Sequence, residues 1–133
     1  MKKTTSLLFA TILFSLISCN NDQSSNNVVV TPHPLATEVG QTIFELGGNA
    51  FDVAVASGFA LSVVEPSMSG IGGRMQAIYF TNDSLGGIDG TTQVPLSYIH
   101  DEYEDGYKFI GIPGVVHGII NIHEGRGRLS LKK

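Results

Sequence analysis

The sequence predicts an α+β fold, in which helices pack on a mixed sheet, and three observations support it. Apolar residues recur at helical spacing over residues 35–46, and a second apolar stretch covers residues 51–64. Two short runs of strand-forming residues, at 75–80 and 85–89, flank turn-forming residues at 82–84. A layered α/β arrangement is the alternative that these elements allow.

The composition limits the possible functions. The 133 residues suffice for one domain at most, and 42% hydrophobic residues is typical of a globular protein. A net charge of −4 with eight Lys and Arg offers no basic surface for nucleic acid. Cys19 is the single cysteine and no histidine pair has metal-ligand spacing, so we expect no disulfide within the chain, no metal and no cofactor.

Residues 1–18 are predicted to be a bacterial lipoprotein signal peptide. Two lysines precede an apolar run, Leu7–Ile17, which is shorter than the about 20 residues of a membrane-spanning helix. The run ends in Leu16-Ile17-Ser18-Cys19, which resembles a lipobox, so we expect cleavage before Cys19 and lipidation of its side chain. An ordinary signal peptide with a chance cysteine, or an uncleaved anchor, is the alternative.

Residues 19–29 are predicted to be a lipid-anchored flexible tether. The stretch Asn20–Asn27 contains only Asn, Asp, Gln and Ser, and it cannot bury apolar area. A lipid on Cys19 would attach the protein to a membrane of the bacterial cell envelope, on the periplasmic or outer-membrane side.

The folded part is expected to begin with a strand and two helices. Val28–Val30 is a β-branched run that predicts a short strand, and the prolines of residues 31–34 lead into a helix that Gly47-Gly48 ends. Asn49 then caps a second helix, with Asp52 in a capping-box position. This helix is apolar nearly all round and too short to cross a membrane, which predicts a buried core helix that ends at Pro66.

The second half is expected to contain a hairpin and a last helix. A Gly-rich loop at residues 67–73 precedes the two hairpin strands, and residues 98–106 read as a polar loop. Residues 107–112 predict another strand. Pro113-Gly114 opens a helix that ends near Gly125, and no closing element follows, so the fold is expected to be unfinished.

Several blocks, in the same order along the chain, resemble segments of the γ-glutamyltranspeptidase family. These blocks are Pro32–Ala36, Gly47–Ala56, Val64–Gly73, Ile88–Gly90, Gly111–Gly118 and His123–Leu129. Together they extend over nearly all of the chain after the tether.

The resemblance implies a layered αββα fold of the N-terminal nucleophile hydrolases, of which residues 30–133 would be an incomplete, truncated N-terminal piece of the large subunit. It implies γ-glutamyl transfer or hydrolysis of glutathione-like amides by a threonine that self-cleavage frees, whose own α-amine serves as base. That threonine is expected beyond residue 133, so we expect no catalytic residue in this chain and no activity from it alone.

Several origins remain open for such a chain. It would be a gene remnant, a frameshifted product, or one part of a split enzyme whose remainder is a second chain. The alternative function is that of a non-catalytic envelope lipoprotein acting as a binding or assembly module.

The sequence departs from the family pattern at one position that the resemblance links to the substrate. Thr91 follows Asp89-Gly90, where the family has an arginine that grips the α-carboxylate of the substrate. Threonine cannot form the bidentate contact of a guanidinium. Arg74, just after the Gly-rich loop, is the candidate substrate-binding residue that could supply a cation nearby; an ordinary surface arginine is the alternative.

Three other segments resemble known functional motifs but lack residues that those motifs require. Gly70–Gly73 lacks the third glycine of a dinucleotide loop and follows a helix, where such loops follow a strand. Ser69 lacks the upstream glycine of a hydrolase elbow. The acidic residues at 101–105 lack the ordered pattern of a calcium loop and are predicted to form a solvated loop.

Overall fold

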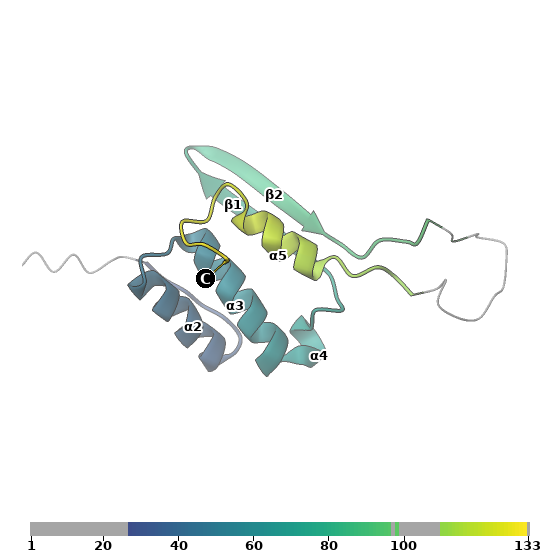
Figure 1. The fold of residues 1–133 in the computed structure, drawn as a ribbon, viewed down its shortest axis with the longest axis horizontal. Helices are drawn as coiled ribbons and strands as arrows, with labels where there is room; N and C mark the ends of the chain where they lie inside the picture. The colour runs from purple at the N-terminus through teal and green to yellow at the C-terminus, as the bar shows by residue number, and fades with distance from the viewer. Residues whose placement is uncertain (1–26, 97, 99–109, 133) are drawn as a thin grey trace, which may run out of the picture.

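The computed structural model describes residues 27–96, 98 and 110–132, and within them helices cover one face of a β-hairpin. Helix α3 is central, with α2 on one side and α5 and the hairpin on the other (Figure 1). The elements are α2 (Pro34–Glu45), α3 (Ala50–Val64), the single turn α4 (Pro66–Ser69), β1 (Met75–Thr81), β2 (Ser84–Gly90) and α5 (Val115–His123).

Helix α2 begins and ends on local signals, and the predicted helix is confirmed. Nδ1 of His33 accepts a hydrogen bond from the backbone N–H of Leu35 at 3.2 Å, and Pro34 occupies the first turn, where no N–H partner is lost. At the other end Gly47 adopts a φ of 86°, the left-handed conformation that glycine accepts readily.

Small residues bring α2 close to α3. Ala36 is fully buried, and a Cβ added to Gly40 would lie 2.7 Å from Oγ of Ser57. The Ser57 hydroxyl donates to the backbone carbonyl of Ala36 at 3.0 Å, so this buried hydroxyl is paired across the contact.

The hydrophobic core lies between α3, α5 and the inner face of the hairpin. Its buried centre is Val55, Val115, Ile119 and Ile122, and partly buried residues pack around it: Phe51, Phe59, Met75, Ala77 and Ile88. The prediction that α3 is a core helix is confirmed in part: Val53, Val55 and Ser57 are buried, but Ala54 is exposed. Its last turn differs, because Val63 is 79% exposed and nothing among the described residues covers it.

The hairpin is confirmed, with a tighter turn than expected. Residues Asn82 and Asp83 form the turn with φ of 49° and 55°, as a two-residue type I′ connection requires, and Ser84 belongs to β2. The antiparallel register pairs Thr81 with Ser84 at the turn and Met75 with Gly90 at the open end.

Other expectations were wrong in part. Val28–Val30 forms no strand, since no described segment pairs with it; the side chain of Val29 instead lies against Gly40 of α2. Among the described residues the sheet is a two-stranded antiparallel hairpin and not a mixed sheet. Pro66 ends α3 as predicted, but the expected loop after it starts with the helical turn α4.

Some predicted segments lie wholly or partly outside the described residues. They are the signal peptide with Cys19, most of the tether, and most of the polar loop at 98–106. Of the predicted strand at 107–112 only the last three residues are described, and they contribute one bridge, between Ile112 and Gln93. No helix in the described ranges is both long and apolar enough to cross a membrane.

Candidate functional site

The most extensive polar cluster of the described residues is centred on Asp52, in the first turn of α3. Asn49 and Asp52 form the predicted capping box: Oδ1 of Asn49 accepts from the N–H groups of Phe51 and Asp52, and Oδ2 of Asp52 accepts from Asn49 N–H at 2.8 Å. The two residues thereby satisfy N–H groups that the helix start leaves unpaired.

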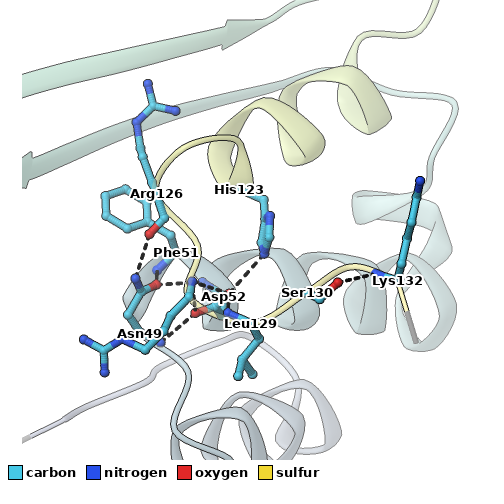
Figure 2. A network of polar contacts seen from close by, with 9 residues as sticks. Asn49, Phe51, Asp52, His123, Arg126, Leu129, Ser130 and Lys132 are labelled. Carbon is cyan, nitrogen blue, oxygen red and sulfur yellow. Dashed lines mark hydrogen bonds and ion pairs between the residues drawn. The ribbon is translucent and has the colours of Figure 1, made fainter.

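The same carboxylate also holds the chain that leaves α5. Backbone N–H groups of Arg128 and Leu129 donate to it at 2.9 Å and 3.1 Å, and Nε2 of His123 lies 3.1 Å from its Oδ1. Figure 2 shows the His123 side chain directed from the end of α5 toward Asp52, with Leu129 beside the carboxylate. Asp52 therefore joins the beginning of α3 to the segment after α5.

Burial and hydrogen bonding shift the pKa of Asp52 in opposite directions. Desolvation of the carboxyl, which is 4% exposed, raises its pKa, while the N–H groups of Asn49, Arg128 and Leu129 and the charge of His123 lower it. The balance is a pKa below the ordinary value, so Asp52 is an anion at neutral pH.

Arg126 closes the cluster on the side of the hairpin. The carbonyl of Arg126 accepts from Nδ2 of Asn49 at 2.7 Å, and its guanidinium donates to the Tyr79 hydroxyl at 3.1 Å while lying 4.9 Å from the centroid of that ring. Phe51 packs edge-on against Tyr79. This set, Asn49, Phe51, Asp52, Tyr79, His123, Arg126, Arg128 and Leu129, is called the Asp52 cluster below.

The chemistry of the Asp52 cluster is that of a structural anchor. An Asp–His pair is also the arrangement that orients a catalytic base. Here, however, both carboxylate oxygens already accept backbone N–H groups, and no hydroxyl or thiol of a described residue bonds to His123. The cluster therefore fixes the course of the chain and lacks a nucleophile.

A second location brings together the predicted substrate-side residues. The open end of the hairpin abuts the start of α5, where N–H groups of Gly114 and Val115 donate to the carbonyl of Gly73 at 3.2 Å and 3.4 Å. A Cβ added to Gly114 would lie only 2.3 Å from the carbonyl oxygen of Gly90. Glycine is required here because the two backbones are in contact.

Arg74 and Thr91 lie at this location. The register ends at the pair Met75 and Gly90, and Arg74 and Thr91 are the neighbours of these two residues outside the ladder. Arg74 is exposed and lines a cavity of about 500 Å³, and its guanidinium has no hydrogen bond or ion pair within the described part of the chain. The N–H of Thr91 donates to Oδ1 of Asp89 at 3.1 Å.

The remaining predictions on sites have mixed outcomes. Cys19 lies outside the described residues, so its lipidation stays a prediction, and so does a role for Arg74 in substrate binding. No three His, Cys, Asp or Glu side chains in the described ranges could share a metal ion. Sequence reasoning found the capping box of Asp52 but missed its contacts to the segment after α5. The block His123–Leu129 was a usable signal, since it contains all three of the distant donors.

Structural comparison gives the class of protein first. The chain resembles the γ-glutamyltranspeptidase of Helicobacter pylori with a TM-score of 0.71 and 36% identity, over 79% of this chain and 34% of that one. Its structural neighbours thus have the N-terminal nucleophile hydrolase fold, as predicted. The described residues supply helices that pack on one hairpin, over a region that covers 34% of that neighbour.

The chain belongs to the γ-glutamyltranspeptidase family. The sequence model of that family, described as gamma-glutamyltranspeptidase, matches residues 36–133. The glutathione hydrolase proenzyme of Bacillus subtilis (strain 168) is 34% identical over 128 residues, which cover 84% of this chain and 22% of that protein. The acylase ACY 1 proenzyme of Pseudomonas sp. (strain V22) is 46% identical over 81 residues, 60% of this chain and 14% of that protein. The chain therefore spans about a fifth or less of the length of these curated relatives.

Proposed function

We propose that this chain contributes one helical layer and the first hairpin to an enzyme that transfers or hydrolyses γ-glutamyl amides such as glutathione. The observation that carries the proposal is membership of the γ-glutamyltranspeptidase family over residues 36–133, together with 34% identity to a glutathione hydrolase proenzyme. A relative named as an acylase is 46% identical over 81 residues, so similarity in this part of the chain does not by itself choose between the two kinds of substrate.

The nucleophile is proposed to come from outside these residues, so the chain alone is inactive. The family resemblance requires a threonine with a free α-amine, and the amine must be close enough to take the proton of the hydroxyl. Thr91, the threonine nearest to the proposed substrate side, has its nitrogen in a peptide bond whose N–H donates to Asp89. It therefore lacks the base that this chemistry uses.

The outer face of the hairpin is the proposed contact with the rest of the enzyme. The inner face packs on α3 and α5, whereas the outer face carries Ile78, Phe80 and Leu85, which are 82%, 70% and 73% exposed. A two-stranded hairpin is marginally stable in water without further cover. A contiguous apolar face of this kind marks an interaction site. The occupant proposed here is the polypeptide that carries the nucleophile, as a second chain.

The function is tested by complementation. The complete chain is assayed for release of a chromogenic amine from a γ-glutamyl anilide, alone and after co-expression with the part of the Bacillus subtilis relative that this chain does not match. Activity only in the mixture is the expected result. Activity of the chain alone would overturn the proposal that the nucleophile lies elsewhere.

A pair of variants tests the contact surface in the same assay. Phe80→Asp places a charge in the proposed interface and is expected to abolish complementation, because a buried unpaired carboxylate opposes assembly. Leu46→Asp is the matched control, since Leu46 is 66% exposed at the far end of α2. Equal loss in both variants would argue against the hairpin as the contact. No complementation by the unaltered chain would favour the non-catalytic lipoprotein.

The location proposed for this function is the bacterial envelope, with a lipid on Cys19. Support comes from the apolar run before Cys19 and the polar stretch after it. Mass spectrometry of the chain made in a bacterial host is expected to show an acylated N-terminal cysteine. Cys19→Ser should remove the added mass and release the protein from the membrane fraction. Recovery of an unprocessed Met1 terminus would contradict the proposal.

A further inference from the structure

Two neighbouring cavities lie along the first half of α3. One, of about 490 Å³, is lined by α3 and β1, and the other, of about 360 Å³, is lined by α3 and the run Val28–Val30. Ala50 and Ala54 line both cavities, and both residues are exposed. The two spaces therefore meet over α3, with β1 on one border and Val28–Val30 on the other.

The larger cavity runs along an edge of β1. Its lining includes the consecutive residues Ala77–Thr81. Successive side chains of a strand point to opposite faces, so an unbroken run of lining residues indicates that the cavity follows the edge of the strand and not one face. Because β2 pairs with the other edge, the edge of β1 at the cavity is free.

The backbone of β1 offers hydrogen-bonding groups along this free edge. Thr81 and Ser84 flank the two-residue turn and form a hydrogen-bonded pair, and such pairs alternate with non-bonded pairs along an antiparallel ladder. Ile78 and Phe80 are therefore in non-bonded pairs, so their N–H and C=O groups point away from β2. A strand edge with a free row of this kind is a template for another strand.

The run Val28–Val30 on the opposite border is also without a partner strand. None of its backbone N–H or C=O groups has a hydrogen bond to another residue that the structure describes. Val28 and Val30 are 80% and 86% exposed, whereas the side chain of Val29 lies against Gly40. This alternation is typical of a strand with one face on a helix layer. The run thus has the pattern of a strand and lacks a neighbour to pair with.

We propose that extended segments of the polypeptide that carries the nucleophile insert between β1 and Val28–Val30, over Ala50 and Ala54, and pair with both borders. The identity of this partner rests on the proposed function. Backbone pairing along both borders requires β-strands, which neither a helix nor a small ligand supplies. The inserted side chains that face α3 are expected to be apolar, because every lining residue of the two cavities is uncharged.

Hydrogen exchange at single-residue resolution, measured by mass spectrometry, tests the pairing. The complete 133-residue chain is studied in detergent, alone and after co-expression with the part of the Bacillus subtilis relative that this chain does not match. Amides of Val28–Val30, Ile78 and Phe80 are expected to exchange freely in the chain alone and at least about tenfold more slowly in the complex. Ala77 and Tyr79 are the internal control, since their N–H groups pair with β2 in both samples.

Two variants on α3 test where the inserted strands lie. Ala54→Phe puts an aromatic ring into the space that the two cavities share, and it is expected to raise the dissociation constant of the complex at least about tenfold in analytical ultracentrifugation. Val63→Phe is the matched control, because Val63 is 79% exposed on the same helix and lines neither cavity. Its dissociation constant should be unchanged, and circular dichroism reports whether each free variant has folded.

Several outcomes would overturn the proposal. A complex in which Val28–Val30 or the free edge of β1 stays unprotected would show that the partner binds elsewhere. Equal dissociation constants for the two variants would remove Ala54 from the contact. Protection of the same amides in the chain alone, together with its sedimentation as a dimer, would make a second copy the occupant. Absence of any complex would leave the two borders without the proposed partner.

Failure of this inference is distinguishable from failure of the proposed activity, because exchange and binding require no catalysis. A complex with the expected protection but no release of amine would support the inserted strands and overturn the activity. An active complex without that protection would support the activity and overturn the inserted strands.

Discussion

Oδ1 of Asp52 lies 3.1 Å from Nε2 of His123, 71 positions further along the chain. The contact joins the first turn of α3 to the last residue of α5, and the carboxylate holds the backbone of residues 128 and 129 as well. One buried side chain thus decides where the chain runs after α5. Any segment that follows starts from this fixed point.

Asp52→Asn is expected to destabilise the fold by about 3 kcal/mol. The amide has the shape of the carboxylate, but its NH2 group would replace the oxygen that accepts hydrogen bonds from the N–H groups of Asn49 and Arg128. Hydrogen bonds to a charged group contribute about 1.5–3 kcal/mol each. Urea unfolding followed by circular dichroism measures the change. Asp83→Asn, in the exposed turn, should change stability by less than about 0.5 kcal/mol. Similar effects of both substitutions would refute the anchoring role.

The stability of the chain should fall in acid because of Asp52. Its folded-state pKa is lowered, so the unfolded state binds the proton more readily, and the stabilisation is complete above the unfolded value of about 3.9. It is lost as the pH falls from there through the lower folded value. Unfolding free energies measured between pH 3 and 6 should show this decrease. The Asp52→Asn variant should show a smaller one, and an identical slope would contradict the assignment.

Gly114→Ala is expected to unfold the chain or to destabilise it by more than about 2 kcal/mol. The new Cβ would lie 2.3 Å from the carbonyl oxygen of Gly90 and 2.4 Å from that of Thr91, and backbone atoms cannot move aside. Gly72→Ala is the matched control, since a Cβ there meets nothing within 4 Å and its φ is not positive. Thermal melting of both variants compares them. Equal melting temperatures would show that α5 does not rest on the hairpin end.

Asp83→Gly should stabilise the hairpin by about 0.5–1 kcal/mol. Asp83 has a φ of 55°, a conformation that costs energy for a residue with a Cβ, and Asn-Gly is the preferred pair for this turn. Asp83→Val should act in the opposite direction, because β-branched residues disfavour positive φ. Denaturant midpoints of the three proteins should follow the order Gly, Asp, Val. A different order would mean that the turn is not type I′ in solution.

Features that depend on near neighbours could be predicted from the sequence. The capping box of Asn49 and Asp52, the helix end at Gly47 and the turn at Asn82 follow from residues within four positions of each other, and all are present. The strand expected at Val28–Val30 is absent because a strand requires a partner to pair with, and β-propensity does not supply one.

The sequence by itself determined the family, the helices and the hairpin of this protein, since local propensities and short motifs carry that information. Only the tertiary structure decided that the Asp52 carboxylate reaches His123 and Leu129, and that the start of α5 rests on the open end of the hairpin. Capping signals predict that an acid sits at a helix start, but not which distant N–H groups approach it. That choice depends on how α5 packs against α3, and the pairing of Met75 with Gly90 depends on the register that the turn at Asn82 sets.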